Sequence, residues 1–519
     1  MSIEMTGLAD IVRQHASRRP GTAAIVHAGR TTTYAELDRA SNQVANGLVA
    51  EGIAPQARVA HLDKSSDIFF ELLFGAAKAN AVMVSVNWRL APPEVLHILN
   101  DAQAEILFVG EEYFPVVEKI RDDLKTVRKI VAFGGRHGAW TSFAEWRDRQ
   151  SAADPHLPVR SGDTAVQFYT SGTTGLPKGA ELTNANFAWM FPLWTRTWLL
   201  APGVPNLVCL PMFHIGGAGW GIAGLFAGAT NHVVREFVPA EILQIVERQR
   251  LQVMLLVPAM ILFLVQAPQI RETDLASLRL IVYGAAPIPA DLLKQAMDIF
   301  PCGFQQVYGL TETTGAITLL PPDDHDPADA KKLLSCGYAQ KGVDLRIVGD
   351  GGEDLPAGKV GEIAVRSPQI MGGYWKLPDA TRRAIQGDWF FTGDAGYLDD
   401  KGYLYIYDRV KDMIVSGGEN IYPAEVESAL FGHPAVADVA VIGVPDERWG
   451  EAVKAVVVKK AGADVNAGEL IAWARERIAG YKLPKSVDFV ETLPRNPTGK
   501  ILKRELRKPY WGDKQRQIN

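Results

Sequence analysis

The first half of the chain alternates between helical and strand-like patterns of apolar residues. Thr33 and Glu36 have the spacing of a capping box ahead of an amphipathic run, which predicts a helix there. Residues 57–62 form an apolar run that predicts a buried strand, residues 66–80 predict a second helix, and residues 81–86 predict another strand. Strands separated by helices of this length are typical of parallel sheets with crossover helices.

The same alternation of helix and strand signals continues from Thr164 to about Leu320. From Cys336 onward, short strands separated by Gly and Asp turns predict a small antiparallel barrel or sheet.

After Asp408 the pattern changes again, and the chain is long enough for more than one core. Helices are predicted at 425–434 and 467–480, and strands at 436–444 and 452–458. We therefore expect an α/β protein with two domains. Residues 1–408 would combine parallel α/β subdomains with a small β-barrel-like subdomain, and residues 409–519 would form a small α+β domain.

Composition narrows the class of protein. With 47% hydrophobic and 22% charged residues, the chain is neither disordered nor a polytopic membrane protein. A formal net charge of −5 argues against general nucleic-acid binding, which needs a positive surplus. The three cysteines are far apart and form no C-x-x-C pair, so we expect neither a disulfide framework nor structural zinc, and we expect a reducing cytoplasm.

Two segments bear on membrane association. The first twenty residues are charged throughout and lack the apolar core of a signal peptide. The charge-free stretch 197–234 has an apolar part, 215–229, that is too short to span a bilayer and rich in glycine, so we expect a buried wall rather than a membrane helix. Membrane contact would then be peripheral at most. The sequence leaves the oligomeric state, including a homodimer, open.

The most informative string runs from Tyr169 to Gly179 and follows a strand-like AVQFY. Three glycines, several hydroxyls and Lys178 at the end of a strand can surround a polyphosphate, because glycine lets backbone N–H groups approach and the other side chains donate hydrogen bonds or charge. The string is not a Walker A loop, which requires G-x-x-x-x-G-K-[ST].

This string resembles the phosphate-loop signature of the adenylate-forming superfamily, which includes acyl-CoA synthetases, peptide-synthetase adenylation domains and beetle luciferases. Four more segments match that family in order along essentially the whole chain. They are Tyr308-Gly-Leu-Thr-Glu312, Thr392-Gly-Asp394, Asp408-Arg-Val-Lys-Asp-Met-Ile414 with the following Gly417-Gly-Glu-Asn-Ile-Tyr-Pro423, and Asn496-Pro-Thr-Gly-Lys500.

The resemblance implies a role for each matching residue in binding ATP and Mg²⁺. The loop would bind the β- and γ-phosphates through Thr170, Ser171, Gly172, Thr173, Thr174, Gly175 and Lys178. Oxygen ligands for Mg²⁺ would come from Thr170 and Glu312, and Thr311 would donate to the α-phosphate. Adenine would lie between Tyr308-Gly309 and the backbone of Gly284, Ala285 and Ala286. The ribose would be held by Asp394 and Arg409, and Lys500 would bridge the attacking carboxylate and the α-phosphate.

Each of these residues also has a structural interpretation when taken alone. Asp394 fits a turn after a strand, Arg409 a surface ion pair, Glu312 a helix cap, and Lys500 one of many lysines near the C-terminus.

The resemblance also implies a mobile C-terminal domain, with a hinge at Lys411, and a pantetheine channel lined by Gly417 and Gly418. Residues 409–519 contain 18 Lys and Arg against 15 Asp and Glu, and residues 471–519 contain 12 against 5. This basic surplus fits either a solvated face or a surface for the phosphates of CoA.

The acyl site is expected near Pro211-Met-Phe-His-Ile-Gly-Gly217. The family has an aromatic or histidine gate there, so His214 would contact the carboxylate or move aside for the thiol; the alternative is a hydrogen-bonded histidine at a helix end. No acidic residue follows Phe213 to pair with a substrate ammonium, which disfavours amino acids. Small and apolar residues suggest a cavity for a chain: Gly216, Gly217, Trp220, Gly309 and Gly315.

We therefore expect an ATP-dependent ligase that joins a hydrophobic carboxylic acid, preferably a fatty acid, to CoA through an acyl-adenylate, releasing AMP and pyrophosphate. Aryl acids, or an acceptor other than CoA, are the alternatives. A nicotinamide dehydrogenase would use the G-x-G-x-x-G at 219–224, but that motif lies in an apolar run without a preceding strand. A non-catalytic ATP-binding scaffold would not need Lys500 or Glu312, yet both positions carry residues that are competent for catalysis.

Overall fold

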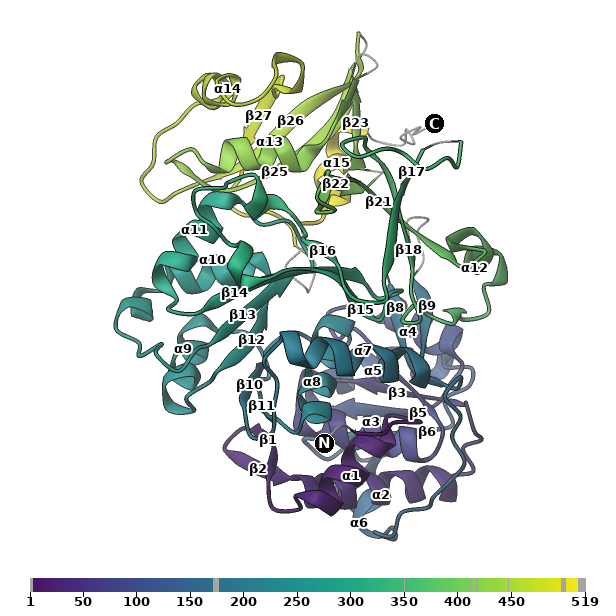
Figure 1. Cartoon of the computed structure of the whole chain (residues 1–519). Coiled ribbons are helices and arrows are strands. Elements are labelled where there is room, and N and C mark those ends of the chain that lie inside the picture. The colour runs from purple at the N-terminus through teal and green to yellow at the C-terminus, as the bar shows by residue number, and fades with distance from the viewer. Residues whose placement is uncertain are drawn as a thin grey trace.

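The structure is a computed structural model, and it describes residues 3–170, 177–349, 351–409, 412–416, 419–446, 448–495 and 501–511, with backbone alone at 407–409, 415, 419 and 420. The fold contains two large α/β sheets, a smaller antiparallel sheet and a C-terminal α+β unit (Figure 1). The predicted α/β fold class is confirmed.

The first large sheet has eight strands in the order β19-β9-β8-β4-β3-β5-β6-β7. Its strands are β3 (Arg58–Leu62), β4 (Val82–Ser85), β5 (Ala104–Gly110), β6 (Lys129–Phe133), β7 (Thr141–Ser142), β8 (Thr164–Thr170), β9 (Lys178–Thr183) and β19 (Gly373–Tyr374). The strands from β8 to β7 are parallel, whereas at one edge β9 pairs antiparallel with β8 and β19 pairs antiparallel with β9.

Helices cover both faces of this sheet, as the predicted crossovers require. They are α2 (Tyr34–Ala50), α3 (Asp67–Lys78), α4 (Pro92–Ala102), α5 (Phe114–Ile120) and α6 (Phe143–Asp148). The capping box predicted at the start of α2 is confirmed, because the Thr33 side chain accepts from the Glu36 N–H and Glu36 accepts from the Thr33 N–H.

The second large sheet has nine strands in the order β16-β15-β14-β13-β12-β10-β11-β1-β2. Its strands are β1 (Ala23–His27), β2 (Arg30–Thr33), β10 (Pro205–Val208), β11 (Thr230–Val233), β12 (Val253–Leu256), β13 (Leu280–Gly284), β14 (Gly303–Leu310), β15 (Gly315–Leu320) and β16 (Tyr338–Ala339). The remaining helices of the two large sheets are α1 (Ala9–Arg18), α7 (Asn184–Thr197), α8 (Ile215–Ala227), α9 (Pro239–Arg248), α10 (Pro258–Gln266) and α11 (Ala290–Ile299), and α1 packs mainly against α2 and α3.

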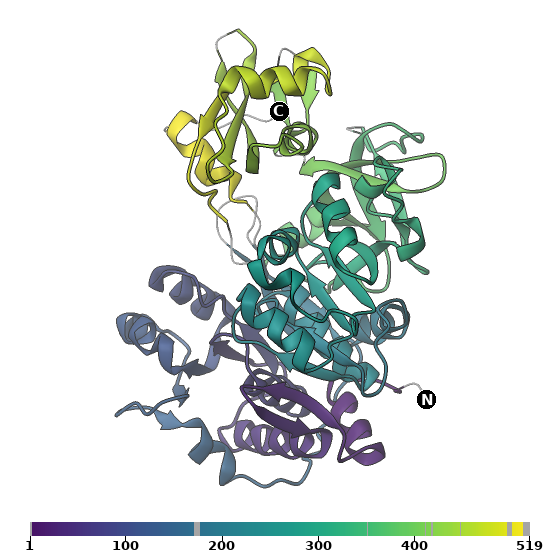
Figure 2. The same cartoon turned by 90° about the vertical axis from the view of Figure 1, so that its left-hand side faces the viewer.

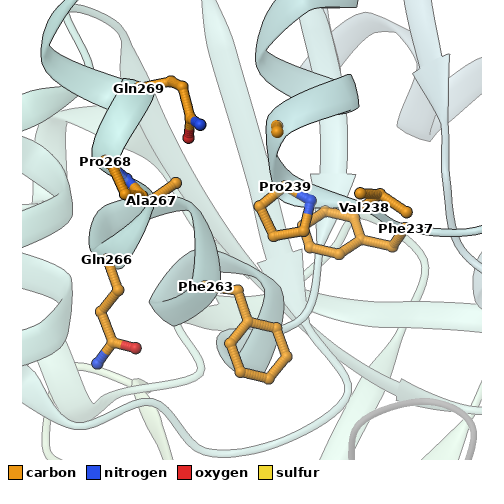
Figure 3. Close-up of a pocket in the computed structure, with 9 residues that line it drawn as sticks. Phe237, Val238, Pro239, Phe263, Gln266, Ala267, Pro268 and Gln269 are labelled. Atoms are coloured by element: carbon orange, nitrogen blue, oxygen red, sulfur yellow. The ribbon is translucent and has the colours of Figure 1, made fainter. Parts of the chain in front are cut away.

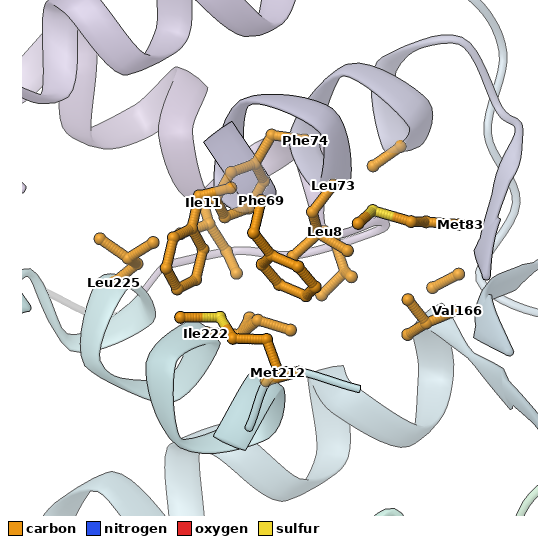
Figure 4. Close-up of a cluster of buried hydrophobic side chains, with 14 of the residues drawn as sticks. Leu8, Ile11, Phe69, Leu73, Phe74, Met83, Val166, Met212, Ile222 and Leu225 are labelled. Carbon is orange, nitrogen blue, oxygen red and sulfur yellow. The ribbon is translucent and has the colours of Figure 1, made fainter. Parts of the chain in front are cut away.

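A shared hydrophobic core joins the two large sheets. Figure 4 shows side chains of α1 and α3, among them Ile11 and Phe69, meeting Ile222 and Leu225 of α8. Most of the apolar stretch 215–229, expected to be buried, is α8, and a Cβ on its Gly221 would lie only 2.6 Å from the Phe70 ring. Within the described ranges, no helix combines the length and the apolar character needed to cross a membrane.

The predicted small antiparallel sheet is confirmed. Its strands pair in the order β17-β18-β21-β20, and β22 pairs with β21. They are β17 (Asp344–Val348), β18 (Gly361–Arg366), β20 (Ile385–Gln386), β21 (Trp389–Leu398) and β22 (Leu404–Arg409), with α12 (Pro378–Ala384) beside them. The chain leaves this sheet between β18 and α12, where β19 pairs with β9 of the first large sheet.

The C-terminal elements gather at one end of the molecule (Figure 2). They comprise β23 (Ile414–Ser416), β24 (Glu419–Ile421), α13 (Pro423–Phe431), β25 (Val436–Asp446), β26 (Gly450–Lys459), α14 (Ala467–Arg475), β27 (Ser486–Phe489) and α15 (Lys503–Trp511). The α+β expectation holds, and the division at residue 409 stays a prediction.

The helix predicted over 467–480 is too long, because α14 ends at Arg475. The N–H groups of Arg477 and Ile478 both donate to the Ala474 carbonyl, and the chain then turns so that Lys482 pairs with Glu425 of α13. Tertiary pairing therefore overrides the amphipathic pattern at this end.

Candidate active site

The described ends of the predicted phosphate loop form a β-hairpin. Thr170 is the last residue of β8 and Lys178 the first of β9, and the two are paired across the antiparallel ladder. This pairing places a hydroxyl and an ammonium at the same end of the sheet, on either side of the loop.

A carboxylate from the second large sheet lies beside this hairpin. Glu312 follows β14, and its Oε1 accepts from Thr170 Oγ1 at 3.3 Å and from Tyr374 Oη at 2.8 Å. Glu312 is buried, with 9% of its surface exposed. Glu312 is not a helix cap, because it lies in the turn between β14 and β15.

The oxygen atoms at this point fit a hard cation that is shared with phosphate. Thr170 and Glu312 bring one hydroxyl and one carboxylate together, and Mg²⁺ is usually held by one or two protein groups plus substrate phosphates and water. Among the described residues, no cluster of three or more His, Cys, Asp or Glu side chains could hold a metal by itself.

The residues predicted to surround adenine lie side by side. Strand β13 pairs in parallel with β14, so that Gly284 is opposite Val307, the neighbour of Tyr308. A Cβ on Gly284 would lie 2.2 Å from the Val307 carbonyl oxygen, which requires glycine there. Ala285, the first residue after β13, has a left-handed φ of 67°.

Tyr308 and Asp394 join the predicted adenine and ribose sites. Tyr308 Oη donates to Asp394 Oδ2 at 2.8 Å, although the two residues are 86 positions apart. Burial and the nearby Asp394 carboxylate raise the pKa of Tyr308, so its hydroxyl stays protonated as a donor. Asp394 is buried, and its backbone pairs with that of Arg409 in the β21–β22 ladder. The two residues predicted to hold the ribose are therefore neighbours on adjacent strands.

The loop between β14 and β15 is held by a segment that precedes β19. Buried Gln369 donates from Nε2 to the carbonyl oxygens of Thr313 at 2.8 Å and Ala316 at 2.6 Å. The Met371 N–H donates to the Glu312 carbonyl at 2.8 Å. The backbone that carries Thr311 and Glu312 is therefore fixed on both sides.

His214 lies at the N-terminus of α8 and is half buried. Its side chain makes no capping hydrogen bond, and Nε2 is buried without a partner among the described residues, which argues against the interpretation as a hydrogen-bonded helix-end histidine. Burial, helped by the Arg89 cation, lowers the pKa of His214 to about 4. The imidazole is therefore neutral near pH 7.

The glycines predicted to open an acyl cavity have different roles. A Cβ on Gly217 would meet the Pro211 carbonyl oxygen at 2.2 Å, and one on Gly309 would meet the Gly315 carbonyl oxygen at 1.9 Å, so both allow close backbone approach. A Cβ on Gly315 would instead have ordinary contacts with Met190 and Ile215.

Two other candidates from the same apolar run have different surroundings. Trp220 is buried and donates from Nε1 to the Leu207 carbonyl, whereas a Cβ on Gly216 would only touch Leu210 at 3.5 Å. The G-x-G-x-x-G at 219–224 lies inside α8, so it does not form the strand-to-helix turn of a dinucleotide site.

Several predicted residues lie outside the described part of the chain, and their roles stay predictions. They are Ser171, Gly172, Thr173, Thr174, Gly175, Lys411, Gly417, Gly418 and Lys500. The side chain of Arg409 also lies outside it.

A surface pocket of about 490 Å³ lies away from these residues. Figure 3 shows it between Phe237, Val238 and Pro239 at the start of α9 and Phe263, Gln266, Ala267, Pro268 and Gln269 at the end of α10 and just beyond. None of the predicted catalytic or nucleotide-binding residues lines it.

Tyr374 and Gln369 contact the candidate site but are absent from the sequence predictions. The Gly-Gly-Tyr-Trp string at 372–375 marks a turn and carries no sign of its contact with Glu312. Such a contact depends on the pairing of β19 with β9, which local sequence patterns do not reveal.

Two parts of the chain match known protein families. Residues 12–375 match the family described as AMP-binding enzyme, and residues 425–500 match the AMP-binding enzyme C-terminal domain. The first match covers more than half of the chain. The chain belongs to the AMP-binding enzymes.

This AMP-binding enzyme is similar over nearly its whole length to ligases of different acids. It is 41% identical over 515 residues to fatty acid–acyl-carrier-protein ligase ScoC of Streptomyces coeruleorubidus, covering 97% of this chain and 96% of that one. It is 40% identical over 506 residues to feruloyl-CoA synthase of an Amycolatopsis species, covering 97% and 99%.

A solved structure agrees with the fold of this AMP-binding enzyme. The crystal structure of ATP-bound MatB from Rhodopseudomonas palustris superposes with a TM-score of 0.90 at 31% identity, covering 99% of this chain and all of that one. The resemblance to the adenylate-forming superfamily, and to its acyl-CoA ligases, is confirmed.

Proposed function

We propose that this enzyme activates a hydrophobic carboxylic acid with ATP and transfers the acyl group to the thiol of CoA. The contact of Thr170 and Glu312 is the observation that carries this proposal, because it joins the phosphate hairpin to the strand that also carries Tyr308. A nucleotide that reaches from this contact to Asp394 has its base, ribose and phosphates beside groups of matching chemistry.

The reaction has two steps. A carboxylate oxygen attacks the α-phosphorus of ATP, the bond to the β-phosphate oxygen breaks, and pyrophosphate leaves. The CoA sulfur, having lost its proton, then attacks the acyl carbonyl, and AMP leaves with the electron pair of the broken C–O bond.

The chain's own groups orient ATP for the first step. Tyr308 and Asp394 fix the base and ribose, and Lys178 and Thr170 hold the outer phosphates. Bound Mg²⁺, held by Thr170 and Glu312, would neutralise phosphate charge. Hydrogen-bond donors and cationic groups such as Thr170 and Lys178, held in place where negative charge develops, provide much of the rate enhancement in sites of this kind.

The acid and the acceptor are proposed from the residues near His214. A neutral histidine and apolar neighbours offer no counter-charge for an ammonium, which favours a fatty acid, with an aryl acid as the alternative. The names of the two relatives cover both kinds of acid, and one relative uses an acyl-carrier protein as acceptor. The basic surplus of residues 471–519 favours an acceptor that carries phosphate.

We also infer the setting of this activity. Residues 1–408 would bind ATP, and residues 409–519 would move about Lys411 between the two steps. The three cysteines are unpaired, which suits a reducing cytoplasm. Small molecules are the expected partners, and a homodimer stays an open alternative.

A pyrophosphate-release screen tests the proposal. The purified enzyme with ATP and Mg²⁺ is offered saturated fatty acids of increasing length and a set of cinnamic and benzoic acids, each with CoA, with a phosphopantetheinylated carrier protein, and with no thiol. Acid-dependent pyrophosphate and a CoA thioester support the proposal. Pyrophosphate without a CoA thioester contradicts the choice of acceptor, and no acid-dependent pyrophosphate contradicts the function.

Lys500→Ala tests the division between the two steps. Loss of the transition-state charge should lower the rate of acyl-adenylate formation by roughly 10²–10³-fold and leave thioester formation from supplied acyl-AMP within a few-fold of wild type. The rates of both half-reactions are measured by stopping them in a quenched-flow apparatus and separating the products by chromatography. Lys508→Ala, which removes an exposed lysine paired with Glu505, is the matched control. An equal loss in both half-reactions would contradict the assigned role.

A further inference from the structure

Tyr374 reaches the phosphate end of the candidate site from a different part of the chain. It is the last residue of β19, and its backbone pairs with Ala180 of β9. Its neighbour Trp375 donates from its backbone N–H to Gly179 and from Nε1 to the Asp101 carbonyl. These bonds fix the Tyr374 backbone to the first large sheet, directly beside Lys178.

The Tyr374 side chain contacts two residues assigned to the triphosphate and its cation. Its Oη donates to Glu312 Oε1 at 2.8 Å, and its ring centroid lies 4.4 Å from Lys178 Nζ. Only 8% of Tyr374 is exposed, so both contacts are largely shielded from water. A cation above an aromatic face at this distance is attracted by the ring.

The hydrogen bonds to Glu312 are unevenly divided between its two carboxylate oxygens. Oε1 accepts from both Tyr374 and Thr170, whereas Oε2 has no hydrogen-bond partner among the residues that the structure describes. The donor from Tyr374 thus fixes the rotation of the carboxylate and keeps one oxygen available.

We propose that Tyr374 is a positioning residue that orients Glu312 toward the cation and holds Lys178 toward the outer phosphates. This inference rests on the proposed function. Groups that hydrogen-bond to a metal ligand set its orientation, and their loss typically costs about 10–100-fold in metal affinity or activity. Tyr374 couples the cation ligand and the phosphate lysine through one rigid side chain.

Two substitutions separate the two contacts. Tyr374→Phe keeps the ring above Lys178 and removes the donor to Glu312. Tyr374→Leu removes both. Tyr403→Phe is the matched control, because Tyr403 Oη also donates to a carboxylate, Asp324 Oδ2 at 2.8 Å, at residues assigned no part in the reaction.

Calorimetric titration with an ATP analogue that has a methylene group between the α- and β-phosphorus atoms provides a readout independent of turnover. Each protein is titrated in excess Mg²⁺ and again in EDTA, and the ratio of the two dissociation constants measures the contribution of the cation. For Tyr374→Phe we expect this ratio to fall by about 10-fold, with the affinity in EDTA within 2-fold of wild type. Tyr374→Leu should also lose about 3-fold in EDTA, and Tyr403→Phe should match wild type.

The outcomes distinguish this inference from the proposed function. A wild-type protein that neither binds the analogue nor exchanges pyrophosphate contradicts the function itself. If wild type does both and Tyr374→Phe keeps its Mg²⁺-dependent ratio, the positioning role is wrong. It is also wrong if Tyr374→Phe loses affinity equally in Mg²⁺ and EDTA, because a purely structural defect would act in that way.

Discussion

The neutral state of His214 leads to a prediction about pH. Burial and the Arg89 cation lower its pKa from 6.5 to about 4, a shift that corresponds to about 3 kcal/mol in favour of the neutral ring. At pH 5.5 a histidine with a pKa of 4 is still about 97% neutral, whereas one with a pKa of 6.5 is only about 9% neutral.

The test compares wild type with His214→Asn, whose side chain does not titrate. The rate of acid-dependent pyrophosphate exchange is measured for both from pH 8.5 to 5.5, and the ratio of wild type to variant is taken at each pH. Titrations of ATP, of the acid and of all other residues act on both proteins and cancel in this ratio. We expect the ratio to stay constant within about 1.3-fold, because His214 does not take up a proton in this range.

A surface histidine supplies the control. The His156 side chain is 79% exposed, and His156→Asn should have the same pH profile as wild type. If the ratio for His214→Asn changes by about 11-fold between pH 8.5 and 5.5, His214 titrates as an ordinary histidine. That result would refute the argument from burial, and with it a role for His214 as a neutral group beside the acid.

Two further predictions concern the close backbone contact at Gly309 and the buried imidazole of His61. Gly309→Ala forces a Cβ to within 1.9 Å of the Gly315 carbonyl oxygen, so we expect pyrophosphate exchange to fall by about 100-fold with the circular dichroism spectrum unchanged. Gly21→Ala is the control and should be fully active, because Gly21 has open space around it. Exchange near the wild-type rate in Gly309→Ala would show that the loop between β14 and β15 adapts. His61→Leu concerns stability: His61 is buried, neither ring nitrogen has a partner among the described residues, and burial lowers its pKa to about 4. The imidazole therefore binds a proton near pH 6.5 in the unfolded chain but only near pH 4 in the folded chain. This difference lowers the free energy of unfolding of wild type by about 2 kcal/mol between pH 7.5 and 5.0. The melting temperature of His61→Leu relative to wild type should accordingly rise on going from pH 7.5 to 5.0, as measured by calorimetry, and an unchanged difference would contradict this reasoning.

The fold class was predictable because its signals are local. Capping at Thr33, the period of the apolar residues and the Gly and Asp turns after Cys336 each act within a few residues, and the corresponding elements form where they were expected. Where a helix end depends on a distant partner, as for α14 and the Lys482–Glu425 pair, the local pattern gave the wrong end.

The candidate site divides in the same way. The sequence by itself determined which groups are proposed to bind the nucleotide, because the phosphate string and Tyr308-Gly-Leu-Thr-Glu312 carry their chemistry in consecutive residues. Only the tertiary structure decided how these groups are oriented. The Tyr308–Asp394 and Tyr374–Glu312 hydrogen bonds span 86 and 62 residues and join residues of different sheets. The desolvation that lowers the pKa of His214 likewise depends on the residues that surround its ring in the folded protein. Hydrogen bonds and desolvation act over a few ångströms in space, so positions along the chain do not encode them.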